Sequence, residues 1–183
     1  MAYIGASPAN RALTSADIED GAIGINDVAF SVGKVLQVVS TTKTDTFATN
    51  PSSSFIDVTG LSVSITPSST SSKVLINISI SGQGVNGVNV AQFRLLRGTT
   101  VIYAGDTAGS RTSGFAASID SDANTAEHIS GVFLDSPSTV SATTYKIQTY
   151  SNGTVYVNRS SVDNDDADRS RSASTILAME IAG

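Results

Sequence analysis

The acidic segment at positions 163–168, DNDDAD, has the residue types of a metal-binding loop. Calcium prefers several hard oxygen ligands, and carboxylates placed close together in one loop can supply them. Asp163, Asp165 and Asp166 are therefore the candidate ligands. A Ca²⁺ site is one hypothesis for this segment.

The neighbouring residues favour a different interpretation of the same segment. Ala167 occupies a position where a further ligand is expected, and the glycine that turns an EF-hand loop is missing. Arg169 and Arg171 follow immediately and would neutralise part of the negative charge. We therefore expect a solvated acidic loop, whose charges could pair across a subunit boundary, and no cofactor, with Ca²⁺ as the alternative.

The single histidine suggests a second kind of chemistry. His128 has Ser130 close by, and Asp120 or Asp135 could complete a Ser-His-Asp triad. Such triads are defined by geometry, and the strand–Ser–helix elbow that presents a reactive serine is absent from the sequence. We therefore expect His128 to have a structural role or to be solvated, and no catalytic residue.

Carboxylates that could cleave a glycan occur at Asp106, Asp120, Asp122, Glu127 and Asp135. A glycosidase needs two of them at a fixed separation, one with a raised pKa, and spacing in the sequence does not test this. The chain has no Trp and only 6% aromatic residues, so it lacks the stacking platform of many sugar sites. Glycan depolymerisation is thus the third of three hypotheses for the function.

A GxGxxG spacing is present at Gly82, Gly84 and Gly87. Dinucleotide binding requires a helix to begin there, so that its N-terminal amides meet the pyrophosphate. The residues that follow, VNVAQFRLL, continue as a strand pattern instead. We therefore expect a loop between two strands.

Composition indicates an all-β protein. The 183 residues are 40% hydrophobic and 15% charged, enough apolar residues for a real core. Thr and Val suit strands, and the abundant Ser and Gly suit the turns between them.

The net charge is −5 and the 11 basic residues form no stripe, which disfavours nucleic-acid binding. No apolar run approaches the roughly 20 residues of a membrane span, so we expect no membrane insertion.

From Lys34 onward the apolar residues alternate with period two. Val58 and Leu61 lie on either side of Thr59-Gly60, where the apolar residues change parity. An unbroken strand would turn inside out there, so the pattern predicts a bulge or bend at Gly60.

Short polar segments separate the predicted strands. TPSSTSS, at 66–72, and Asn152-Gly153 each predict a hairpin between the flanking runs, as does the turn at 97–100. About eight strands with short turns predict a jelly-roll-like antiparallel β-sandwich over residues 34–183.

Residues 1–33 differ from the rest and are too irregular to bury their own apolar residues. Ile18, Ile23 and Ile25 are spaced regularly, for which a solvated tail offers no reason. The sequence therefore predicts an N-terminal anchoring arm that docks on a partner chain through these residues.

Several segments carry a resemblance to a known group of proteins. VLQVVSTTKTDTF, VTGLSVSITPSSTSSKVLI, FLDSPSTVSATTYKIQ, VYVNRS and STILAMEIAG together resemble virion structural proteins of marine and cyanobacterial tailed phages. LTSADIEDGAIG resembles short segments of phage tail-fibre and tail-associated proteins. The succession of strands is also similar to the trimeric jelly-roll heads of fibre tips.

The resemblance implies a non-enzymatic virion protein located in the phage particle. The first hypothesis is a homotrimeric tail fibre or spike that attaches to a host surface glycan or protein, with its arm bound to other virion proteins. The loops at 105–127 and 160–172 would be its exposed surfaces. The alternative is a capsid head-decoration or cement protein.

Overall fold

The computed structural model describes residues 33–84, 90–118 and 124–183, which contain eleven β-strands and no helix. The all-β prediction is therefore confirmed. Within these ranges, accordingly, no helix has the length and hydropathy to cross a membrane. The arm residues Ile18, Ile23 and Ile25 lie outside the described residues.

The strands follow one another with no intervening helix in the described ranges. In chain order they are β1 (Val35–Lys43), β2 (Phe47–Thr49), β3 (Ile56–Ile65), β4 (Lys73–Gly84), β5 (Ala91–Arg97), β6 (Thr100–Tyr103), β7 (Ala116–Ser118), β8 (His128–Asp135), β9 (Thr143–Tyr150), β10 (Val155–Val157) and β11 (Ser174–Ile181).

The first sheet is organised around β4, its longest strand. One edge of β4 pairs with β8, and the other edge pairs first with β11 and then, beyond Ser79, with the short strand β10. β1 pairs with the free edge of β11, and β2 with that of β10. The order β1-β11-β4-β8 is antiparallel throughout.

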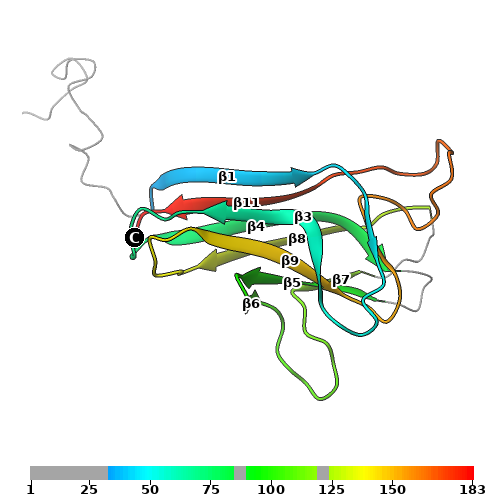
Figure 1. The fold of residues 1–183 in the computed structure, drawn as a ribbon, viewed down its shortest axis with the longest axis horizontal. Helices are drawn as coiled ribbons and strands as arrows, with labels where there is room; N and C mark the ends of the chain where they lie inside the picture. The colour runs from blue at the N-terminus through cyan, green and yellow to red at the C-terminus, as the bar shows by residue number, and fades with distance from the viewer. Residues whose placement is uncertain (1–32, 85–89, 119–123) are drawn as a thin grey trace, which may run out of the picture. The chain divides into compact units, whose positions relative to one another are not determined.

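The second sheet has the antiparallel order β3-β9-β5-β6. β7 pairs with the first residues of β5 and β6 with its last residues, so both lie along the same edge. The two sheets form the layers of a sandwich (Figure 1).

The core lies between these layers, and alternation along each strand supplies it. On β4, Val74, Ile76, Ile78 and Ile80 are all fully buried and face the second sheet. The fully buried Phe93 on β5 and Tyr145 on β9 face them from the other side. Sheet-on-sheet packing of alternating residues therefore generates a single core.

Two of the three predicted hairpins are wrong. Segment 66–72 joins β3 of the second sheet to β4 of the first, and Asn152-Gly153 joins β9 of the second sheet to β10 of the first. Alternation identifies the buried face of a strand but not its hydrogen-bonding partner, and a sandwich lets consecutive strands face each other across the core. The turn at 97–100 does close a hairpin, in which Arg97 pairs with Thr100.

The predicted bulge at Gly60 is confirmed. The pairing of β3 with β9 shifts between Asp57 and Ser62, and Gly60 has a φ of 82°, in the left-handed region. A Cβ atom at Gly60 would lie 3.4 Å from Nζ of Lys43, which is itself buried. Glycine is therefore needed here for its backbone angle, while an added Cβ would only be in van der Waals contact with the end of the Lys43 side chain.

We expect Gly60→Ala to lower the free energy of unfolding by about 1–2 kcal/mol, from the strain of a left-handed backbone angle. Gly98→Ala is the matched comparison, because Gly98 has a φ of 58° and nothing within 4 Å of its Cβ position. It should cost a similar amount, since the same strain applies. Urea unfolding measures both, and unchanged stability in Gly60→Ala would contradict the role of the backbone angle.

Candidate functional site

The outer face of the first sheet is apolar at one end. Side chains that point away from the core align in rows across β1, β11, β4 and β8, because the registers of these strands place them opposite one another. The rows are Val38–Met179–Leu75–Leu134, Ser40–Leu177–Asn77–Val132 and Thr42–Thr175–Ser79–Ser130.

These rows contain no charged residue, and their polarity changes along the strands. The first is entirely aliphatic or thioether, the second is mixed and the third consists of hydroxyl side chains. Val38 is 53% exposed, Val132 58% and Leu134 49%. Leu36, which precedes the first row on β1, is also exposed. Large apolar side chains exposed side by side mark an interaction surface.

The sequence analysis missed this surface, which we call the apolar face. A signal for it was present: Val132-Phe133-Leu134 and Leu177-Ala178-Met179 are apolar at both parities, whereas a half-solvated strand alternates with polar residues. Continuous apolar runs indicate a strand covered on both faces. Only the register shows that these runs lie in one sheet.

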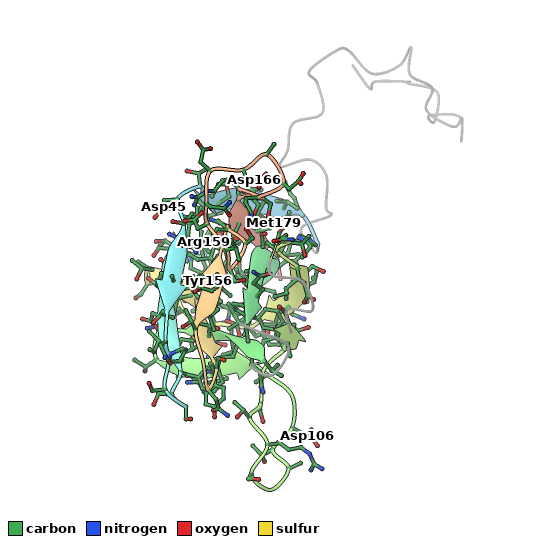
Figure 2. The ribbon with its side chains drawn as sticks, turned by 90° about the vertical axis from the view of Figure 1, so that its right-hand side faces the viewer. Asp45, Asp106, Tyr156, Arg159, Asp166 and Met179 are labelled. Carbon is green, nitrogen blue, oxygen red and sulfur yellow. The ribbon has the colours of Figure 1, made fainter. Side chains whose placement is uncertain are left out.

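The acidic loop is held by ion pairs. The carboxylate of Asp163 lies 3.0 Å from Nη1 of Arg159 and 2.5 Å from Nη2 of Arg171. The Arg159 guanidinium also lies over the ring of Tyr156, 4.5 Å from its centroid (Figure 2). Asp163 is thus already neutralised, as the charge pattern predicted.

The other two candidate ligands do not join Asp163 in a metal site. Asp165 and Asp166 are exposed, and the carboxylate of Asp166 accepts a hydrogen bond from the amide of Asp168. A hollow of about 230 Å³ beside them is lined by Arg169 and Arg171 as well as by the acids. Among the described residues, no group of three or more His, Cys, Asp or Glu side chains is gathered to hold a metal ion.

Among the residues that the structure describes, no Ser-His-Asp triad is assembled around His128. His128 begins β8 and Asp135 ends it, so their Cα atoms lie roughly 23 Å apart at the rise of a strand. The Asp135 carboxylate instead accepts hydrogen bonds from Nη1 of Arg97 at 2.8 Å and from the hydroxyl of Tyr145 at 2.7 Å. Burial and the bond to Asp135 raise the pKa of Tyr145 well above its ordinary value. This network links the two sheets.

The remaining candidates are likewise dispersed. Asp106 is exposed on the loop between β6 and β7, and the backbone carbonyl of Glu127 accepts a hydrogen bond from the amide of Gly82. Gly82 and Gly84 belong to β4, so the glycine-rich segment starts as a strand. Asp120, Asp122 and Gly87 lie outside the described residues.

A buried carboxylate that the sequence analysis did not single out lies at one end of the sandwich. Glu180 on β11 is fully buried and accepts hydrogen bonds from Nε2 of Gln37 at 2.6 Å and from the amide and hydroxyl of Ser68 at 2.7 and 2.6 Å. Burial alone would raise the pKa of Glu180, but these donors outweigh it and lower the pKa to about 2. The carboxylate ties β1 and the β3–β4 connection to β11.

Comparison with known proteins gives no further assignment, since no protein-family model and no curated protein matches this chain.

The lowered pKa of Glu180 predicts a pH dependence of stability. Its folded-state pKa lies below the ordinary value of 4.5, so its contribution is fully present above pH 4.5 and is lost as the pH falls towards about 2. Glu180→Gln should lower the free energy of unfolding by about 1–3 kcal/mol at neutral pH, because the new amide group would face the hydrogen-bond donors of Gln37 and Ser68 with a donor of its own. Denaturant titrations at a series of pH values measure the difference from wild type.

That difference should shrink progressively below pH 4.5. Asp165→Asn, on the exposed acidic loop, is the control and should leave stability nearly unchanged. A difference that stays constant down to the lowest pH would contradict the assignment.

Proposed function

We propose that this chain is a non-enzymatic structural protein of a tailed-phage virion that assembles as a homotrimer through the apolar face. The observation that carries the proposal is the set of aliphatic side chains aligned and exposed across β1, β11, β4 and β8. Leaving such a face in water is unfavourable, and burying it against copies of itself stabilises the assembly.

The distribution of charge supports a second copy as the occupant. The chain carries a net charge of −5, so two copies repel each other at most surfaces. The rows of the apolar face hold no charge, which makes them the surface where copies approach with the least repulsion. Their polar end, with Asn77, Thr42 and Thr175, provides hydrogen-bonding groups that copies can share.

The order of the strands supports a jelly roll as the form of the sandwich. The chain passes from one sheet to the other at β2–β3, β3–β4, β4–β5, β7–β8, β8–β9 and β9–β10, and the long strands form two antiparallel sheets. A double-sheet sandwich of eight strands built in this manner is characteristic of jelly rolls, which occur in viral structural proteins.

The polarity of the sandwich supports the roles given to arm and loops. The amide of Gly33 donates a hydrogen bond to the carbonyl of Ala182, so the first described residues lie beside the end of the last strand, β11. The acidic loop lies at the opposite end (Figure 1). In our proposal the arm binds other virion proteins, and the far loops of a tail fibre or spike face the host.

The assembly is tested by sedimentation velocity of Val132→Glu. The variant places one glutamate of each copy, three in all, in an apolar interface, which costs several kcal/mol. The association constant of the trimer should therefore fall at least about a thousandfold, and the variant should sediment as a monomer. Val101→Glu is the matched control, because Val101 is 40% exposed on β6 of the other sheet. It should remain trimeric.

A wild-type chain that sediments as a monomer at micromolar concentration would refute this assembly. A dimer would retain the apolar face as an interface but refute the threefold arrangement. Circular dichroism of both variants should show the same β-rich spectrum.

Electron microscopy of particles labelled with an antibody against the sandwich tests the place in the virion. We expect a few labels at the tail. Labels spread over the shell in large numbers would instead support the decoration or cement protein, and unlabelled particles would refute a virion role.

A further inference from the structure

The loop between β6 and β7, residues 104–115, projects from the second sheet (Figure 1). Its two ends are fixed together, because the rings of Tyr103 and Phe115 stack with centroids 5.0 Å apart. The amide of Gly105 donates to the carbonyl of Gly114 at 3.0 Å, which closes the neck of the loop. The loop is therefore held in one position by its base.

Its interior is also braced. The hydroxyl of Ser113 donates to the backbone carbonyl of Asp106 at 2.7 Å, and the amide of Arg111 donates to the carbonyl of Ala108 at 3.2 Å. A Cβ atom at Gly114 would lie 2.7 Å from the carbonyl oxygen of Phe93. The loop therefore approaches β5 so closely that only glycine fits at this position. Such bracing orders side chains before a ligand arrives.

A hollow of about 320 Å³ lies between this loop and the edge of the second sheet. This volume is at the lower end of small-molecule sites, roughly 300–1,000 Å³. Polar lining comes from Gln92, Asp106, Arg111 and Thr112, while glycines and alanines supply small apolar surfaces.

The polar side chains of the hollow differ in their hydrogen bonding from the polar side chains beside it on the same sheet. On the neighbouring row, Gln148 accepts two hydrogen bonds from Arg94 and donates to Asp57, so these groups satisfy one another. Within the described part of the chain, neither the amide of Gln92 nor the carboxylate of Asp106 has a hydrogen-bond partner in the structure. Their donors and acceptors are available to a ligand.

An aromatic side chain lies one strand away from the hollow, beside Gln92. Gln92 pairs with Ala117 on one side and with Tyr150 on the other, so the three side chains form a row on the outer face of the second sheet. The hydroxyl of Tyr150 donates to the side chain of Asn152, and its ring packs against Phe55 with centroids 5.3 Å apart. Tyr150 does not line the hollow itself, but it borders Gln92, which does.

We propose that this hollow binds an uncharged saccharide unit of a host surface glycan. Sugar hydroxyls donate and accept at once, which matches a carboxylate, an amide and a guanidinium held together at Asp106, Gln92 and Arg111. The methyl groups of the alanines that line the hollow suit the apolar faces of a sugar. The inference rests on the proposed attachment function, because it names the ligand class of that function.

The position of the hollow suits attachment by the proposed trimer. It belongs to the second sheet, whereas the apolar face belongs to the first, so assembly leaves it open. A shallow site of this size binds one unit weakly, and three copies on one particle component would gain strength by avidity.

The test is binding of the full chain to an array of neutral oligosaccharides, followed by titration of the strongest binder. Asp106→Asn and Gln92→Ala should each weaken that binding at least about tenfold, because each removes hydrogen bonds to the sugar. Asp165→Asn is the control, an exposed acid on the separate loop that carries Asp166 (Figure 2), and it should bind as wild type.

Two results would overturn the saccharide site: no binding to any neutral saccharide, or unchanged binding by both hollow variants. These failures are distinct from failure of the proposed function. If the chain is a trimer but binds no saccharide, only the saccharide site is refuted. If the chain is a monomer that binds a saccharide, and Asp106→Asn abolishes this binding, the saccharide site is supported and the trimeric assembly is refuted.

Discussion

The structure depends on the burial of one strand, β4, between its neighbours. Its inward side chains Val74, Ile76, Ile78 and Ile80 are fully buried, and each contributes roughly 1.5–3 kcal/mol relative to an exposed position. Both edges of β4 are paired, with β8 on one side and with β11 and then β10 on the other. The other strands of the first sheet take their places from this one.

Polar contacts fix how the second sheet lies on the first. Asp135 of β8 accepts hydrogen bonds from Arg97 of β5 and Tyr145 of β9, so one buried carboxylate joins strands of both sheets. Glu180 joins β11 to Gln37 of β1 and to Ser68 in the connection between the sheets. Each buried carboxylate accepts hydrogen bonds from more than one element, so both are specific to this arrangement.

The two outer faces of the sandwich have different chemistry. The first sheet presents uncharged rows that are apolar at one end and carry hydroxyl groups at the other. The second sheet presents Arg94, Gln148 and Asp57 in mutual hydrogen bonds beside a polar hollow. A surface that binds copies of the same chain and a surface that binds a hydroxylated ligand need these opposite properties. The proposals for assembly and for saccharide binding therefore concern separate faces and can be tested independently.

The sequence by itself determined the local features. Period-two alternation and abundant Thr, Val, Ser and Gly gave the strands, the parity change gave the bulge at Gly60, and the arginines beside DNDDAD indicated a loop neutralised by its own neighbours. These follow from local rules, because alternation and charge balance act between residues near in the chain.

Only the tertiary structure decided which strands pair. The segment 66–72 and Asn152-Gly153 look like hairpin turns, yet each crosses between sheets, because all the strands of the described ranges pack on the same core. The same competition aligned Val38, Met179, Leu75 and Leu134, which come from four distant parts of the chain, into one apolar row. Continuous apolar runs indicate strands that are covered on both faces, but the sequence does not show which runs align in one row, since register between distant strands is set by packing across the whole sandwich.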